Sequence, residues 1–221
     1  MMSRRSVLSS VLGSLLLAGV AAAGEFEGII VLKETSGGET VQQQWWFKGH
    51  ALRFEEVGPD AGKGAMIFDA KKHALYSLHH DEKIYLEIST ATTSESQPFD
   101  DIAITKTGQH EKVAGYVCEV YRMKDRSDGS TGEFCMAKAI GSAALFGMTS
   151  AQAGGASLWP GWMRDLFKDG GFPIKGVDRD GRGREEARWE AVTIESQPLA
   201  DRLFVPPSDY QKQEMAVIKP E

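Results

Sequence analysis

Apolar and polar residues alternate along most of the chain between Phe26 and Glu195, and short turn sequences interrupt the alternation. A period of two is typical of β-strands, because successive side chains of a strand point to opposite faces. Strands joined by such short turns pair antiparallel, since a parallel neighbour needs a long crossover connection. The pattern predicts antiparallel strands over Phe26–Thr35, Thr40–Phe47, Leu52–Phe54, Ala65–Phe68, Ala74–Leu78, Ile84–Ile88, Ile102–Lys106, Lys112–Met123, Phe172–Val177 and Glu185–Glu195.

Several of these strands are apolar on both faces. Trp45 and Trp46 are neighbours in one strand, so their rings must point to opposite sides of the sheet. A sheet with two apolar faces needs two covers, which a helical element and the inside of a curved sheet can supply. The predicted fold is mainly β (α+β), a curved antiparallel sheet or half-barrel of about ten strands covered by one or two short helices.

One segment has the periodicity of a helix. Trp159, Trp162, Met163, Leu166 and Phe167 follow the spacing i, i+3, i+4, i+7 and i+8, which forms one apolar stripe, and two glycines follow it. The preceding stretch, residues 139–156, is rich in Ala, Gly and Ser and predicts a short helix and a loop. The striped helix is therefore the expected cover of the sheet.

The N-terminal residues have the features of a secretory signal peptide. Two arginines precede an apolar stretch, Val7–Val20, and small residues follow at 21–23, which predicts cleavage after Ala23. Residues 24–221 are then expected to form a single half-barrel domain in the periplasm. The general secretion route is favoured, and a twin-arginine motif at Ser3–Leu8 is the alternative. Val20 stands where a lipoprotein would need Cys, so no lipid anchor is expected, and no other segment is long and apolar enough to span a membrane.

Composition narrows the class of protein. The chain has 221 residues, of which 42% are hydrophobic and 25% charged, so it is too apolar to be intrinsically disordered. The net charge is −6, and it becomes −8 when Arg4 and Arg5 are removed with the signal. An acidic chain is a poor partner for nucleic acid, because binding to phosphates needs positive charge.

The two cysteines, Cys118 and Cys135, lie on two strands joined by the polar stretch Lys124–Thr131. Their positions are nearly symmetric about this turn, so they are expected opposite each other across a hairpin. An oxidising compartment favours a disulfide between them, and the chain-entropy model assigns it about 3 kcal/mol of stability. A redox pair is the alternative, but neither Cys-x-x-Cys spacing nor a nearby basic cluster supports it.

Residues for catalysis or metal binding are sparse. His79-His80-Asp81-Glu82 is the one dense group of metal-type ligands, and it is typical of a polar hairpin tip, with metal binding left open. The sequence has no nucleophile elbow and no phosphate-binding glycine-rich loop. We therefore expect neither an enzyme nor a bound cofactor or metal.

Tryptophan and methionine are the more informative side chains, because they can line an adaptable apolar pocket or simply fill the core. The candidate residues for a pocket or its cover are Trp45, Trp46, Met148, Trp159, Trp162, Met163, Phe167 and Trp189.

Several motifs resemble those of a family of exported bacterial proteins of unknown function, over most of residues 26–212. The motifs are Met66–Lys72 with Leu75-Tyr76, Lys83–Glu87, Lys106–Tyr121, Gly132–Ala137 and Leu203–Tyr210. The most specific are Gly115-Tyr116-x-Cys118 and Phe204-x-x-Pro207-x-x-Tyr210. That family in turn resembles the lipoprotein carriers and receptors of the LolA/LolB type. The resemblance implies an antiparallel half-barrel whose concave apolar face is covered by helices, but it carries no function with it.

The leading hypothesis is a soluble periplasmic module that binds or carries an apolar ligand, a lipid or acyl chain, between the concave sheet and the helix at Trp159–Phe167. The alternative is an envelope protein-interaction or sensing domain with a filled core and no ligand. Cavity volume distinguishes the two, because a ligand needs space that side chains do not occupy.

Overall fold

The structure, a computed structural model, describes residues 25–58, 62–92, 101–141, 143–153, 156–157, 161–168 and 170–214. The predicted signal peptide lies outside these residues. The strands are β1 Gly28–Ser36, β2 Glu39–Lys48, β3 Ala51–Val57, β4 Gly64–Asp69, β5 Ala74–His79, β6 Ile84–Ser89, β7 Ala91–Thr92, β8 Ile102–Val113, β9 Tyr116–Asp125, β10 Thr131–Ala137, β11 Ala151–Ala153, β12 Ala156–Ser157, β13 Phe172–Arg179, β14 Glu185–Ser196 and β15 Gln211–Gln213.

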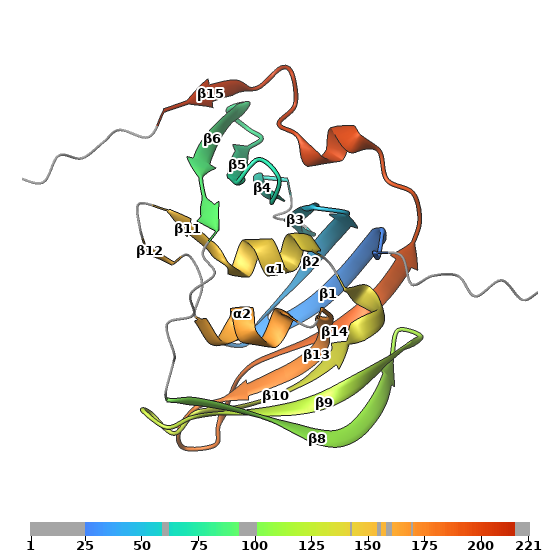
Figure 1. Cartoon of the computed structure of the whole chain (residues 1–221), viewed down its shortest axis with the longest axis vertical. Coiled ribbons are helices and arrows are strands. Elements are labelled where there is room, and N and C mark those ends of the chain that lie inside the picture. The colour runs from blue at the N-terminus through green and yellow to red at the C-terminus, as the bar shows by residue number, and fades with distance from the viewer. Residues whose placement is uncertain are drawn as a thin grey trace, which may run out of the picture.

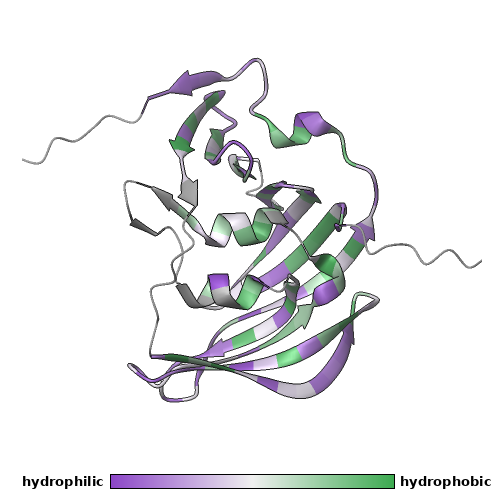
Figure 2. Cartoon of the chain, viewed as in Figure 1, coloured by the Kyte–Doolittle hydropathy of each residue, from purple (hydrophilic) through white to green (hydrophobic). Residues whose placement is uncertain are grey.

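Twelve of the described strands form one curved, unclosed sheet in the order β15-β6-β5-β4-β3-β2-β1-β14-β13-β10-β9-β8 (Figure 1). A small sheet of order β12-β11-β7 lies beside it. The mainly β fold class and the curved sheet are as predicted from the alternating pattern, and they match the architecture that the LolA/LolB resemblance implies. Figure 2 shows the alternation directly, as apolar and polar residues follow one another along several strands.

Two features of the sheet differ from the prediction. The expected strand Lys112–Met123 is divided by a two-residue turn at Ala114 and Gly115, whose φ angles are 47° and 88°. Such a turn joins two strands tightly, and the apolar residues on both sides of it hid the boundary. In addition, β15 pairs parallel with β6, whereas the other described pairs of the sheet are antiparallel. The long C-terminal segment makes this possible, because it crosses the molecule before it pairs.

Two short helices, α1 Ala143–Thr149 and α2 Gly161–Phe167, lie side by side on one face of the sheet (Figure 1). A 3-10 turn, η1 Lys138–Ile140, leads into them. The close approach of α1 to the end of β4 requires glycine at position 147, since an added Cβ would lie 2.8 Å from the Cβ of Ala70, directly after the strand. Neither described helix has the length and hydropathy of a membrane span.

We call the side of the sheet under α1 and α2 the helix-bearing face. Its centre consists of the fully buried side chains of Ile30, Phe47, Leu52, Phe68 and Ile174. The rings of Phe26 and Phe172 meet Phe47 edge to face, at centroid distances of 6.0 and 5.3 Å. Such aromatic contacts add to the free energy of apolar burial.

The opposite side, which we call the outer face, has its own apolar cluster around Trp46, Ile67, Tyr76 and Leu78. The C-terminal segment, residues 197–213, covers this cluster with Leu199, Leu203, Phe204 and Tyr210 (Figure 1). Phe204 lies in a 3-10 turn, η2 Asp201–Phe204. The sheet therefore has the two covers that its two apolar faces require, and the second is the C-terminal segment.

Candidate ligand-binding site

Trp45 and Trp46 lie on opposite faces, as their adjacency predicts. Trp45 stacks on Phe54 at a centroid distance of 4.6 Å on the helix-bearing face. Trp46 belongs to the outer cluster, where the guanidinium of Arg53 lies 5.5 Å from its ring. The two tryptophans therefore cannot line the same pocket.

The candidate residues of the helices pack into the core. Met148 and Phe167 are each 4% exposed, and Met163 packs against the same cluster. Trp159 and the side chain of Trp162 lie outside the described part of the chain. The cavities of about 710, 620 and 450 Å³ in the described part have no lining residue from α1 or α2. The described inward side chains of α1 and α2 thus pack against the core of the sheet.

An open space lies instead at the other end of the helix-bearing face. There the ends of β2, β3, β4 and β5 that lie away from α1 surround a cavity of about 450 Å³. We call it the open-end cavity. Phe54 and Met66 are cross-strand neighbours and form its apolar floor. Gln43, Glu56, Ser77 and His79 contribute polar groups.

Gln43 links the cavity to the aromatic cluster. Trp45 Nε1 donates a hydrogen bond to Gln43 Oε1 at 3.3 Å, and Gln43 Nε2 donates to Glu34 Oε2 at 3.1 Å. The donor on Trp45 fixes which end of the amide is oxygen, since an indole nitrogen can only donate. Each end of the amide thus has one hydrogen bond and keeps one more hydrogen-bonding position.

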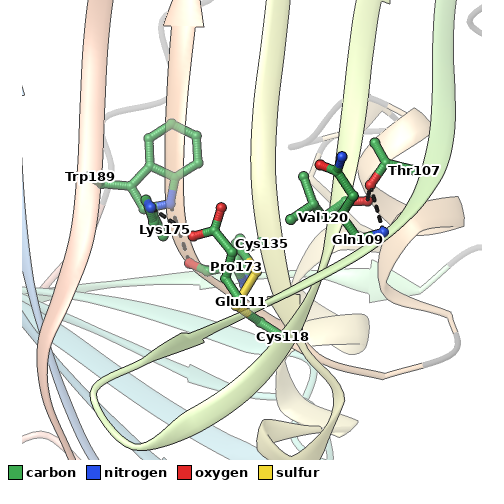
Figure 3. The surroundings of a disulfide bond; sticks show 9 residues. All are labelled: Thr107, Gln109, Glu111, Cys118, Val120, Cys135, Pro173, Lys175 and Trp189. Carbon is green, nitrogen blue, oxygen red and sulfur yellow. Dashed lines mark hydrogen bonds and ion pairs between the residues drawn. A yellow bond between two sulfur atoms is a disulfide. The ribbon is translucent and has the colours of Figure 1, made fainter.

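Trp189 also lies on the helix-bearing face, but at a different place. Its ring covers Gly176, and a Cβ at position 176 would overlap it. Trp189 Nε1 donates to the carbonyl of Pro173 at 3.3 Å (Figure 3). The glycine is therefore required for the position of the ring, and Trp189 does not line the open-end cavity.

Carboxylates gather near Trp189. Burial raises the pKa of Asp178, and the nearby charges of Glu186 and Glu34 raise it further. Glu34 is the cross-strand neighbour of Trp189. This part of the helix-bearing face therefore has a negative potential when its carboxylates are ionised.

The predicted disulfide joins Cys118 and Cys135, whose Cα atoms are 5.2 Å apart (Figure 3). The two residues are not directly opposite each other, because the strand register places Val120 opposite Cys135. The disulfide thus runs diagonally, a difference that the symmetry of the turn did not reveal. A disulfide fits an exported protein, since cytosolic thiols are kept reduced.

Beside the disulfide, the outer face has a groove of about 710 Å³. Lys175 Nζ and Glu111 Oε2 form an ion pair across it at 2.7 Å, which ties β13 to the β8–β9 hairpin (Figure 3). The hydrogen bond to Glu111 raises the pKa of Lys175 against the effect of burial, and the charges of Glu111, Glu190 and Glu133 raise it further. The groove is lined by equal numbers of acidic and basic side chains, Glu111, Glu133, Glu185 and Glu190 with Lys33, Lys175, Arg179 and Arg188.

The polar turn at His79–Glu82 does not gather ligands for a metal. His80 Nδ1 lies 2.6 Å from the hydroxyl of Tyr210 in the C-terminal segment, whereas His79 lines the open-end cavity. Among the described residues there is no group of three or more His, Cys, Asp or Glu side chains that could hold a metal ion.

Sequence reasoning missed Gln43, Phe54 and Met66 as site residues. The alternation of side chains along a strand could have identified them. Gln43 is two residues from Trp45 and therefore shares its face, and Phe54 and Met66 lie on the same face of the two neighbouring strands. The pattern alone could not show which end of that face the helices leave uncovered.

The chain matches a family model over residues 26–210, that of a domain of unknown function, DUF4412. No curated protein sequence matches it. An uncharacterized conserved protein from Thermus thermophilus has a similar structure, with a TM-score of 0.53 and 10% identity over 87% of this chain and 93% of that one. At this identity the likeness establishes a shared fold alone.

Two further structures are less similar. The MucA/MucB complex of Pseudomonas aeruginosa gives a TM-score of 0.48 and 10% identity, over 86% of this chain and 58% of the matched one. A domain named for outer membrane lipoprotein sorting, from Vibrio parahaemolyticus, gives a TM-score of 0.33 and 10% identity, over 83% and 90% of the two chains. Scores below 0.5 support no inference about function.

Proposed function

This chain belongs to the DUF4412 family of domains of unknown function, and from the geometry of its open-end cavity we propose that it binds an apolar ligand, such as a lipid or acyl chain, without transforming it. The cavity is the observation that carries the proposal. Its volume of about 450 Å³ lies within the range of small-molecule sites. Phe54 and Met66 offer apolar surface and the rim offers a few polar groups, which is the usual composition of such sites.

The proposal places the ligand at the open end of the helix-bearing face rather than under the helices. Trp45, stacked on Phe54, lies next to the cavity floor and would report on its occupancy. In this proposal the protein is exported by the general secretion route, loses residues 1–23 by cleavage of the signal peptide, and acts in the periplasm. The disulfide supports this setting, because structural disulfides are rare where thiols are kept reduced.

The test is to purify the protein from periplasm without detergent and to analyse its organic extract by mass spectrometry. In parallel, Trp fluorescence is followed while a dodecyl amphiphile, monolaurin or laurate, is added below its micellar concentration. We expect a bound apolar molecule in the extract, or saturable binding of at least one probe. The proposed function is refuted if no apolar molecule co-purifies and neither probe binds.

Two variants locate the site. Ser77→Phe should fill the cavity and weaken probe binding at least about tenfold, because the ligand then loses its apolar contact area. Ser89→Phe places the same ring on an exposed position of β6 outside the cavity and should bind as the unmodified protein does. Equal binding by both variants would place the ligand elsewhere.

A second candidate function is a contact with an envelope protein. The groove of about 710 Å³ on the outer face favours it, since its lining of mixed charges resembles the polar part of a protein interface more than a lipid site. Charge reversal at Arg179, which lines the groove, should then weaken partner binding and leave amphiphile binding unchanged.

A further inference from the structure

The polar groups of the open-end cavity define what the end of a bound ligand must be. Gln43 is held on both sides, since its oxygen accepts from Trp45 and its nitrogen donates to Glu34. A side chain fixed in this way has lost its rotational freedom before a ligand arrives, so it can form a hydrogen bond at low entropic cost. The amide retains one donor and one acceptor position for this purpose.

The charges around Gln43 oppose an anionic ligand. Glu34 is hydrogen-bonded to the amide, and Glu55 and Glu56 are lining residues. Glu55 is paired with Arg53 at 2.8 Å, which leaves the carboxylates of Glu34 and Glu56 to act on a ligand. Lys63 also lines the cavity and adds one positive charge, which the carboxylates of Glu34 and Glu56 outnumber. A carboxylate or phosphate placed beside Gln43 would therefore meet like charges.

An uncharged polar group meets no such opposition. Ser77 adds a hydroxyl to the lining, which both donates and accepts, and it is the cross-strand neighbour of Met66 on the cavity floor. Gln43 and Ser77 together suit a ligand end that carries hydroxyl or amide groups. The apolar part of the same ligand would lie on Phe54 and Met66.

We propose that the open-end cavity selects a neutral amphiphile, a single apolar chain that ends in hydroxyl or amide groups, and that Gln43 determines this specificity. The inference rests on the proposed function, because it names the class of ligand for the same cavity. It goes further in stating that fatty-acid anions are poor ligands although they carry the same apolar chain.

Three probes with a saturated twelve-carbon chain separate the contributions: monolaurin is neutral, laurate is anionic and dodecyltrimethylammonium is cationic. Each is titrated by calorimetry at pH 8 and low salt, below its micellar concentration, into the unmodified protein. We expect monolaurin to bind more tightly than laurate by about fivefold or more, from the hydrogen bonds to Gln43 and the repulsion of the carboxylate.

The outcomes are distinct. If none of the probes binds and no apolar molecule co-purifies, the proposed function fails together with the inference. If none of the probes binds although an apolar molecule co-purifies, only the inference fails. If laurate binds as tightly as monolaurin, only the inference fails, because the cavity then recognises the chain and not its end. If the cationic probe binds most tightly, the carboxylates and not Gln43 set the preference, and the inference is again overturned.

A matched pair of variants tests the role of Gln43. Gln43→Leu should weaken monolaurin binding about fivefold and leave laurate binding unchanged, so the preference disappears. Gln44→Leu makes the same change one residue along β2, on the outer face, and should retain the preference. If both variants lose the preference for monolaurin over laurate, or if neither does, Gln43 does not determine the specificity. The comparison of the three probes on the unmodified protein does not depend on either variant.

Discussion

On the helix-bearing face, α1 and α2 contribute apolar side chains to the core, among them Leu145, Met148 and Phe167. On the outer face, the C-terminal segment adds ion pairs to its apolar contacts. Lys48 pairs with Asp201 at 2.7 Å, Lys83 with Asp209 at 2.8 Å and Lys212 with Glu87 at 2.6 Å. The outer cover thus combines apolar contacts with exposed ion pairs.

This difference follows from the conformations of the covering elements. A helix presents a continuous stripe of apolar side chains to the sheet. An extended segment has few inward-facing residues, here Leu199, Leu203, Phe204 and Tyr210. Polar contacts add to them: Lys48 and Arg53 donate to the carbonyls of Leu199 and Leu203, and the ion pairs of Asp201 and Asp209 lie beside them. We expect the helix-bearing face to carry most of the global stability and the outer cover to respond to solution conditions.

The largest effect is expected at the centre of the helix-bearing face. Phe47→Ala removes a fully buried ring that contacts Phe26, Trp45 and Phe172, and it should lower the free energy of unfolding by about 3–5 kcal/mol. Urea unfolding measures the loss. The exposed Val41→Ala on the same strand should change the value by less than about 0.5 kcal/mol. A loss below about 1 kcal/mol at Phe47 would show that the core is not centred there.

Next in size is the disulfide at the edge of the outer groove. Replacing both Cys118 and Cys135 by Ala should cost about 3 kcal/mol, because the unfolded chain regains the freedom of the closed loop. A thiol count on the unmodified protein checks the bond, and two free thiols would contradict it. Under reducing conditions the unmodified protein should approach the stability of the double variant.

The third effect concerns the packing of Trp189. Gly176→Ala should cost about 1–3 kcal/mol, since the new Cβ overlaps the indole ring and must displace it. Near-ultraviolet circular dichroism should change along with stability. The control is Ala187→Gly on β14, which exchanges the same two residue types without an overlap. Gly183→Ala would not serve, because the positive φ of Gly183 makes any side chain there strained. An unchanged tryptophan signal in Gly176→Ala would contradict the proposed overlap.

A smaller effect tests the negative potential near Trp189. Because the pKa of Asp178 is raised by burial and then by Glu186 and Glu34, its ionised form destabilises the native state. This cost is complete above the folded-state pKa, fades as the pH falls through it, and is absent below the unfolded-state value. Asp178→Asn should therefore stabilise the protein at neutral pH and lose this advantage in acid. The measurement is the free energy of unfolding of both proteins as a function of pH. If Asp178→Asn is less stable than the unmodified protein at neutral pH, the ionised Asp178 stabilises the native state and the prediction is wrong.

The smallest effect separates the two covers most directly. Raising ionic strength from about 0.1 to about 1 M shortens the screening length from about 10 to about 3 Å and weakens the exposed ion pairs of the C-terminal segment. The amide of Gln211, which donates to the carbonyl of Lys83 at 2.8 Å, should then exchange its hydrogen faster. The amides of β1 at the centre of the sheet should not respond. Equal acceleration in both places would mean that salt acts on the whole fold.

The sequence predicted the strands well because alternation reports directly on burial: β2, β4 and β5 lie within a residue or two of their predicted bounds. It also predicted the disulfide from the position of the two cysteines. The candidate site was predicted less well. Trp46 shares its chemistry with Trp45 but lies on the other face, and Met148 is core.

The reason lies in how far apart in the chain the relevant residues are. The open-end cavity depends on β2, β3, β4 and β5 together and on where α1, roughly seventy residues beyond β5, stops covering them. Periodicity measures which side chains share a face, but it carries no information on which part of that face a distant element covers.

The sequence by itself determined the two-sided apolar strands, the pairing of Cys118 with Cys135 and the need for two covers, because each follows from local spacing and the pleat of a strand. Only the tertiary structure decided that the C-terminal segment is the second cover and that Gln43, Phe54 and Met66 line an open space. These depend on contacts between distant segments, where the free energy of packing and of ion pairs, rather than local conformational preference, selects the arrangement.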